Sequence, residues 1–255
     1  MDPIRRLVER LTPGRPEPPT QRVLFVHIPK TAGMSLYHAL ERWAGPGRAI
    51  RYPNGGVEDL AAWRDLSQAR LDQLRLVSGH LPLHEFRRRD MTGWAPITLL
   101  RDPVARTLST YSYIRGHRSH PWHELVSPMD LDAFLDWFES RPANLDQQCG
   151  FITPTRTAET ALDVLAEEFL LAGTVERLGA FDAALSEVLG TTIRTPAHNR
   201  SRRPVDPSSL PATTIDRIRA MHPQDGALVA TLHERGLAGT FARDAERPGQ
   251  GGVGA

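Results

Sequence analysis

The stretch VLFVHIPKTAGMSLYHALERW, residues Val23 to Trp43, decides how the rest of this sequence is interpreted. It begins as an apolar run, breaks at Pro29 and resumes with the spacing of a helix. The turn between the two parts, HIPKTAGMS, holds a lysine, a glycine and two hydroxyl side chains. The first backbone N–H groups of a helix, together with its dipole, favour a negative group. The stretch therefore predicts a strand, an anion-binding turn and a helix in that order.

Each polar residue of the turn has a physical use in binding an anion. Lys30 adds a mobile cation, Thr31 and Ser35 add hydroxyl donors, and Gly33 allows the backbone to approach closely. The alternative is a helix capped by hydroxyl residues, with a lysine that is there by chance.

The turn differs from the phosphate loop of nucleoside triphosphatases, G-x-x-x-x-G-K-[ST]. Thr31 follows Lys30 directly, as the hydroxyl residue does in that loop, but the glycine comes after the lysine and the earlier glycine position lies in the strand. No partner acid is placed to complete a magnesium site. A magnesium-dependent triphosphatase is therefore disfavoured.

Apolar runs without strict alternation are typical of strands that are covered on both faces. Such runs are Arg22–Ile28, Ala49–Tyr52, Arg75–Gly79, Ala95–Leu100 and Phe169–Gly173. Segments with helical spacing are Met34–Trp43, Pro103–Arg115, Leu131–Glu139, Ala158–Glu167, Leu178–Leu189, Ala212–Met221 and Gly226–Arg235. The alternation predicts a three-layer α/β fold, with a central parallel sheet and helices on both faces. Ligands of such sheets bind outside the carboxyl ends of the strands.

A second polar cluster, ITLLRDPVARTLSTYSYIR, follows the fourth predicted strand. Asp102 is a good N-cap and the proline after it suits the first helical position. Arg101, at the strand end, and Ser109, two turns along the helix, are expected to converge on a second phosphate near the sheet edge. Asp102, Arg106 and Ser109 share a helix face by spacing, so the alternative is an Asp102–Arg106 pair on the helix surface.

Taken together, HIPKTAGMS and LLRDPVARTLSTY resemble the motifs of sulfotransferases that use 3′-phosphoadenosine 5′-phosphosulfate (PAPS). The similarity is to the carbohydrate branch that includes heparan sulfate 2-O-sulfotransferases and their bacterial relatives, whose fold is P-loop nucleotide-hydrolase-like. The resemblance implies that the first motif holds the 5′-phosphosulfate and that Arg101 and Ser109 hold the 3′-phosphate. The residues of the first motif are Lys30, Thr31, Ala32, Gly33, Met34 and Ser35.

Weaker similarity extends from about Arg22 to Leu189, in the segments VSGHLPLHEF, ANLDQQCGFIT and FLLAGTVERLGAFDAAL. The family has Thr or Ser where this chain has Met34, so one side-chain donor is missing. The implied activity is metal-independent transfer of a sulfuryl group from PAPS to an acceptor hydroxyl, on a carbohydrate, glycoconjugate or glycolipid. The implied product is adenosine 3′,5′-bisphosphate.

Sulfuryl transfer needs a cation at the leaving phosphate and a base at the acceptor hydroxyl. Lys30 is the expected cation. His80 is the expected base, because it follows a strand that ends at the same sheet edge and its ordinary pKa lies near neutrality. His84 is the second choice. Pro82 separates the two histidines, so they are not expected to form a helical metal pair.

Other polar segments allow more than one interpretation. RGHRSHPWHE holds His117, His120 and His123, and a solvated loop beside the acceptor is favoured over a metal site. EFRRRD is interpreted as a solvated face, or as a surface that attracts an acidic acceptor. The loop with Arg200, Arg202 and Arg203 closes over the nucleotide or is plain surface. Cys149 has neither a helix start nor cations beside it in the predicted structure, and is expected to be inert.

The chain has 255 residues, a formal net charge of +1 and one cysteine. Near-neutral charge argues against a nucleic-acid partner, and a single cysteine suits a reducing compartment. With no membrane-length apolar run, the sequence predicts a cytoplasmic protein. Residues 1–20 are expected to be an extension and linker, 21–240 a single domain, and 241–255 a flexible tail. Two rival functions remain: a kinase-like enzyme on a related fold, and a noncatalytic nucleotide-binding scaffold.

Overall fold

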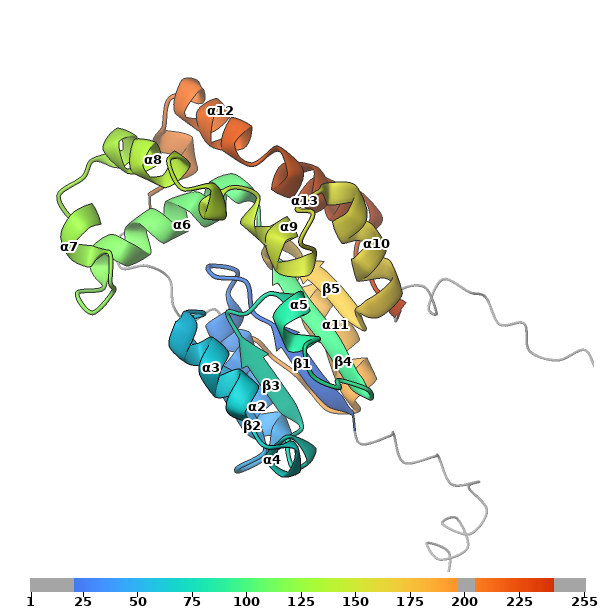
Figure 1. Cartoon of the computed structure of the whole chain (residues 1–255). Coiled ribbons are helices and arrows are strands. Elements are labelled where there is room, and N and C mark those ends of the chain that lie inside the picture. The colour runs from blue at the N-terminus through green and yellow to red at the C-terminus, as the bar shows by residue number, and fades with distance from the viewer. Residues whose placement is uncertain (1–20, 197–204, 241–255) are drawn as a thin grey trace, which may run out of the picture.

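The apolar runs of the sequence form one parallel sheet in the computed structural model, which describes residues 21–196 and 205–240 (Figure 1). The strand order is β2-β3-β1-β4-β5. The strands are β1 (Arg22–Val26), β2 (Ala49–Tyr52), β3 (Leu76–Gly79), β4 (Trp94–Leu100) and β5 (Leu171–Thr174). The predicted three-layer α/β fold is confirmed. Because all neighbours are parallel, the carboxyl ends of the strands lie along one edge.

All five predicted strands and all seven predicted helices are present, with boundary shifts of up to three residues. The predicted helices are α2 (Gly33–Ala44), α6 (Pro103–Gly116), α8 (Leu131–Glu139), α10 (Ala158–Glu168), α11 (Leu178–Leu189), α12 (Ala212–Met221) and α13 (Pro223–Arg235). The sequence analysis missed further helices, which are α3 (Val57–Asp65), α4 (Gln68–Asp72), α5 (Leu83–Phe86), α7 (His123–Val126) and α9 (Gln147–Ile152). Four of them, α4, α5, α7 and α9, have at most 6 residues, which is too short to show a clear helical repeat. The helix α3 is as long as α8, but it buries only Asp59 and Trp63, so no apolar stripe marks it.

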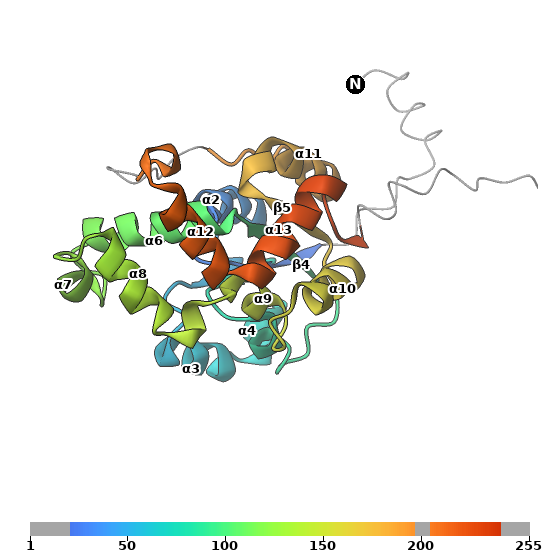
Figure 2. The same ribbon diagram turned by 90° about the horizontal axis from the view of Figure 1, so that it is seen from above.

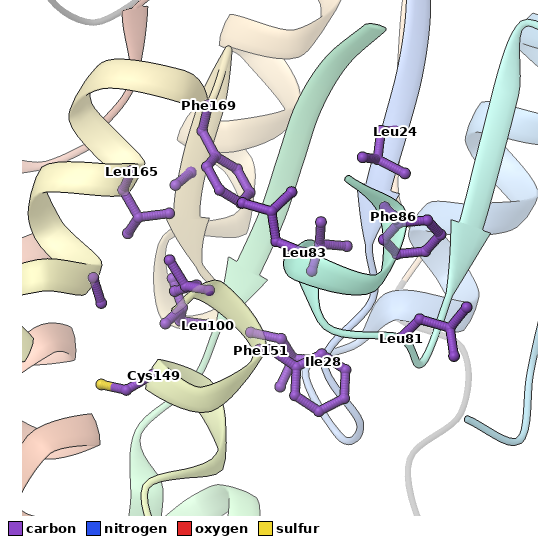
Figure 3. Packing of buried hydrophobic residues seen from close by; sticks show 14 of the residues in the cluster. Leu24, Ile28, Leu81, Leu83, Phe86, Leu100, Cys149, Phe151, Leu165 and Phe169 are labelled. Atoms are coloured by element: carbon purple, nitrogen blue, oxygen red, sulfur yellow. The ribbon is translucent and has the colours of Figure 1, made fainter. Parts of the chain in front are cut away.

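Helices cover both faces of the sheet, as Figure 2 shows from above. One face packs against α2 and α11 through residues such as Leu36 and Phe181. The other packs against α3, α5, α9, α10 and α13, where Phe86, Phe151 and Phe169 fill the space over the strands (Figure 3). Strand side chains alternate between these two apolar layers, which is why the strand sequences are apolar throughout.

A separate apolar cluster joins α6, α7, α8 and α12 beyond the carboxyl edge of the sheet (Figure 1). Phe134 and Leu135 of α8 are fully buried there, as is Ile218 of α12. This helical group holds α6 over the strand ends. It therefore places side chains from α6 above the turn that follows β1.

A buried polar network connects α6 to α9 and α13. Arg106 of α6 is 1% exposed; its Nη1 donates to Gln147 Oε1 at 2.7 Å, and its Nη2 lies 3.9 Å from Asp225 Oδ2. Asp225 also accepts hydrogen bonds from the backbone N–H groups of Gln148 and Cys149, at 3.1 and 2.9 Å. The anticipated surface pair of Asp102 and Arg106 is therefore wrong: Arg106 points inward, and Asp102 caps α6 by accepting from Ala105 N.

Asp146, His222 and Asp225 bring potential metal-ligand atoms within 4.8 Å of one another. Hydrogen bonds already occupy these atoms. Asp146 Oδ1 accepts from the backbone of Gln224 and Asp225, and His222 Nδ1 accepts from Asp146 N. Burial lowers the pKa of His222 to about 4, with a further contribution from the Arg106 charge, so the ring is neutral at pH 7. The cluster is thus accounted for as reciprocal capping of α9 and α13.

Among the described residues, no helix combines the length and the apolar character needed to cross a membrane. The predicted extension at 1–20, the tail at 241–255 and the loop arginines Arg200, Arg202 and Arg203 lie outside the described residues.

Replacing Asp225 by Ala is expected to lower the free energy of unfolding by about 3–5 kcal/mol, because it removes the carboxylate that faces the buried Arg106 charge and leaves two backbone N–H groups without their acceptor. Asp225→Asn, which keeps an acceptor oxygen, should cost less. Asp216→Ala on the exposed side of α12 is the matched control, and should change stability by less than about 0.5 kcal/mol. Urea unfolding at neutral pH measures all three. A loss below about 1 kcal/mol for Asp225→Ala would contradict a stabilising role.

Candidate functional site

The ends of β1, β3 and β4 bring three predicted groups to one edge of the sheet. The turn after β1 carries Lys30, the residue after β3 is His80, and the residue after β4 is Arg101. Their neighbourhood follows from the strand order, in which β1 lies between β3 and β4. The sequence prediction that these residues share one sheet edge is therefore correct.

The turn after β1 has an uncommon backbone. Lys30 and Ala32 adopt left-handed conformations, with φ of 70° and 60°. Left-handed residues beside right-handed ones turn successive N–H groups into a concave anion-binding nest. Thr31 is fully buried, and its hydroxyl donates to the Ile28 carbonyl at 2.9 Å. The Thr31 side chain therefore stabilises the turn, and an anion would meet its backbone N–H group.

His27, which the sequence analysis did not single out, lies beneath this turn and is 3% exposed. Its ring stacks on Phe25, with centroids 5.1 Å apart, and meets the His80 ring edge-on at 4.3 Å. A Cβ atom added to Gly33 would lie 1.9 Å from His27 Nε2. Gly33 is thus needed for contact between the first turn of α2 and His27. In the sequence, His27 lies among apolar residues and is interpreted only as part of the predicted strand Arg22–Ile28.

His80 is held by backbone contacts on both sides. Its N–H group donates to Tyr52 O at 2.9 Å, and its ring hydrogen bonds the Pro53 carbonyl. The ring atom Nε2 is buried and has no hydrogen-bond partner in the described part of the chain. Burial lowers the pKa of His80 to about 4, and the Arg51 charge adds to the effect. The imidazole is therefore neutral at pH 7, with Nε2 able to accept a proton.

Lys30 extends over an aromatic ring rather than toward a carboxylate. Its Nζ lies 3.6 Å from the ring centroid of Tyr113 on α6. Burial, with a smaller contribution from the nearby Arg101 charge, lowers the pKa of Lys30 to about 8. Cation–π contact gives the ammonium partial compensation. The site thus contains a desolvated cation without an ionic partner among the described residues.

Arg101 is fixed mainly through its backbone. The fully buried side chain of Gln148 accepts from Arg101 N and donates to Arg101 O, both at 2.9 Å. The Arg101 guanidinium donates to the Lys30 carbonyl at 3.2 Å, which links the β4 end to the turn. Gln148 belongs to α9, whose start is capped by Asp225. The segment ANLDQQCGFIT is noted for its similarity to the family, but no feature of that segment identifies Gln148 as the partner of Arg101.

Ser109 lies on the α6 face that turns toward the site. It precedes Tyr113 by one helical turn, and residues four apart share a face. Tyr113 contacts Lys30, so Ser109 lies on the same side of α6. No contact joins Ser109 to Arg101 within the described residues. Convergence of these two residues on one phosphate remains a prediction.

Arg51 on β2 is a further cation that sequence reasoning missed. Its Nη1 contacts Met34 Sδ, and its guanidinium lies 5.1 Å from the Tyr37 ring centroid. Its charge lowers the pKa values of His27 and His80. The only sequence signal was its place one residue before the end of a predicted strand. Met34 and the buried Ser35 begin α2 as predicted.

The remaining candidates lie outside this centre. His84, on α5, is partly exposed beside Glu85, with Nε2 and Oε1 3.6 Å apart. The rings of His117 and His120 pack on Tyr113, and His123 contacts the Ile114 carbonyl. His117 and His120 therefore form an aromatic group with Tyr113, the ring over which Lys30 lies.

Cys149 lies in the first turn of α9, so the expectation of no helix start beside it is wrong. Burial nevertheless raises the pKa of its thiol, which agrees with an inert residue. The arginines of EFRRRD have partners as well. Arg88 pairs with Glu85, Arg87 pairs with Glu168, and Arg89 stacks over Trp63.

In comparisons with known proteins, no family model and no curated protein matched this chain. The fold is established as three-layer α/β. Membership of the PAPS-dependent sulfotransferases stays a prediction from the two motifs.

Gly33→Ala is expected to destabilise the fold by about 1–3 kcal/mol and to disturb the turn, since the new methyl group would overlap the buried His27 ring. The double variant Gly33→Ala/His27→Ala removes the overlap and should recover part of that loss relative to His27→Ala alone. Urea unfolding of the four proteins gives the coupling free energy. Additive losses would contradict direct contact between Gly33 and His27.

Proposed function

We propose that this chain is a PAPS-dependent sulfotransferase that acts on a hydroxyl group of a carbohydrate or glycoconjugate. The observation that carries the proposal is the joint placement of Lys30, His80 and Arg101 at the carboxyl edge of a parallel sheet. The nest formed around Lys30 and Ala32 supports binding of a 5′-phosphosulfate, and Arg101 with Ser109 supports binding of a 3′-phosphate. We also place the protein in the cytoplasm as part of this proposal.

The chemical properties of the site fit an anionic donor. Lys30 is desolvated and no carboxylate of residues 21–196 and 205–240 pairs with it, so an anion would supply the missing countercharge. His80 Nε2 is buried and has no hydrogen-bond partner in the same part of the chain, so an acceptor hydroxyl would supply the missing hydrogen bond. The Lys30 ammonium and His80 Nε2, the two groups that need a partner, both lie at the carboxyl edge of the sheet.

PAPS supplies an activated sulfuryl group whose sulfur is bonded to a phosphate oxygen. In the proposed reaction a bond forms between sulfur and the acceptor oxygen while the bond to the phosphate oxygen breaks, and the leaving phosphate keeps the electron pair. Lys30 stabilises the charge that develops there. His80 Nε2 takes the hydroxyl proton, and the Pro53 carbonyl holds the opposite side of the ring. A neighbouring anionic donor raises the pKa of His80 from its low value, which improves the match to a base at neutral pH.

The first experiment is a calorimetric titration with adenosine 3′,5′-bisphosphate, in parallel with ATP and magnesium. Micromolar binding of the bisphosphate and none of ATP is expected. Arg101→Ala should weaken the bisphosphate by at least about tenfold, because it removes the strand-end cation and its bond to the Lys30 carbonyl. Arg194→Ala, at an exposed arginine, should leave affinity unchanged.

Arg101→Lys separates charge from geometry, because it keeps the charge and loses the planar fork. Thermal unfolding of each variant confirms that the protein remains folded. Binding of ATP alone would overturn the sulfotransferase proposal in favour of the kinase-like alternative. If neither the bisphosphate nor ATP binds, the proposal of a nucleotide site is overturned.

The affinity for the bisphosphate is expected to fall as pH rises through about 8, the pKa of Lys30 in the free protein. Below that pH the ammonium is charged and binds the anion; above it, binding must first restore the proton. Affinity should drop by up to about tenfold per pH unit, while the phosphates, with a second pKa of about 6, are already ionised. Titrations from about pH 7 to about pH 9.5 measure this dependence. Lys30→Arg should flatten the profile, and an unchanged slope in that variant would assign the titration to another group.

A further inference from the structure

A cavity of about 410 Å³ lies at the opposite edge of the sheet, where β1, β2 and β3 begin. Its lining includes Arg22, Arg48, Arg70 and Arg75, with Asp72 as the one acidic residue. In Figure 1 this edge is the one beside α4. The cavity shares no residue with the candidate site around Lys30, His80 and Arg101, which lies at the carboxyl ends of the strands.

The charge of this cavity is local. The whole chain has a formal net charge of only +1, yet four arginines and one acidic residue line this cavity. That carboxylate is 3.8 Å from Arg22, a loose ion pair. Four like charges in one concave space repel one another, and an anion bound among them would remove that cost.

Two of the arginines are held in place by the protein itself. Arg75 lies over the Trp43 ring at 4.3 Å, and its buried Nε has no hydrogen-bond partner among the residues that the structure describes. Arg70 donates from Nη2 to Gly47 O at 2.8 Å and from Nη1 to Gln73 Oε1 at 3.3 Å. These contacts reduce the side-chain entropy that binding a ligand would otherwise cost.

Arg48 completes the arrangement as an adjustable group. It is exposed, and its side chain makes no hydrogen bond or ion pair with the described residues. A cavity with two oriented guanidiniums and one unengaged guanidinium matches a tetrahedral oxyanion, since the planar fork of arginine donates paired hydrogen bonds to phosphate or sulfate oxygens.

We propose that this cavity is a second ligand site, which binds the phosphate or sulfate group of a small molecule. The volume is in the range of small-molecule pockets, and the charge is confined to one hollow instead of a stripe along the surface. A small ligand is therefore favoured over a nucleic acid. The site does not depend on the proposed sulfotransferase activity, because none of its residues belongs to that mechanism.

The test uses the full chain carrying Lys30→Ala and Arg101→Ala, so that the carboxyl-edge site cannot account for binding whatever its true ligand is. Calorimetric titration with inorganic pyrophosphate should show saturable binding with one ligand per chain. Adding Arg48→Ala should weaken it by about tenfold or more, and adding both Arg48→Ala and Arg70→Ala should abolish it. Arg235→Ala, at an exposed arginine on α13, is the matched control and should have no effect.

A second readout localises the ligand independently of the variants' stability. Nuclear magnetic resonance of arginine Nε–H groups should show a shift of the Arg75 signal during the titration. Parallel titrations with inorganic phosphate and with sulfate distinguish the two kinds of oxyanion. Unchanged affinity in Arg48→Ala, equal loss in Arg235→Ala, an unmoved Arg75 signal, or no saturable binding of any of the three anions would each overturn the proposal.

Discussion

The carboxyl edge of this protein depends on a buried guanidinium and a buried carboxylate, those of Arg106 and Asp225. Neither group could be buried alone without a large desolvation cost. Asp225 uses its remaining capacity to cap α9, and α9 supplies the Gln148 amide that holds the Arg101 backbone. Arg101 then contacts the Lys30 carbonyl. The turn after the first strand is thereby connected, through the side chains of Arg101, Gln148 and Asp225, to a helix almost two hundred residues later in the chain.

The two polar edges of the sheet use positive charge in different ways. At the carboxyl edge, burial lowers the pKa values of Lys30, His27 and His80, because each ring or ammonium is desolvated without a nearby carboxylate in direct contact. At the amino edge, the guanidiniums keep partial solvation and rest on carbonyls or on Trp43. At the carboxyl edge Lys30, with a pKa of about 8, can change its protonation near physiological pH, whereas the guanidiniums of the amino edge stay charged throughout.

Much of the fold could be predicted because its signals are local. Five apolar runs and seven helical repeats could be recognised one by one, and motifs at two strand ends place Lys30 and Arg101 at one edge. His80 followed from the same rule. What escaped prediction depends on contacts distant in sequence. Arg106 carries the same local pattern whether its partner is Asp102, one turn before it, or Asp225, and only the packing of α13 decides between them. Gln148 and His27 were likewise defined by partners on other elements.

The left-handed residues of the turn after β1 determine whether a motif search based on glycine can detect that turn. Most phosphate-binding loops place glycine where the backbone needs a positive φ angle, and patterns built on glycine spacing detect them for that reason. Here lysine and alanine take those positions, at Lys30 and Ala32, while the one glycine of the turn is required for close packing against His27. Residues other than glycine therefore adopt the positive φ angles of this turn. A motif search that requires glycine at positive-φ positions would therefore miss this turn. It would also miss related turns in which other unbranched residues occupy the positions of Lys30 and Ala32.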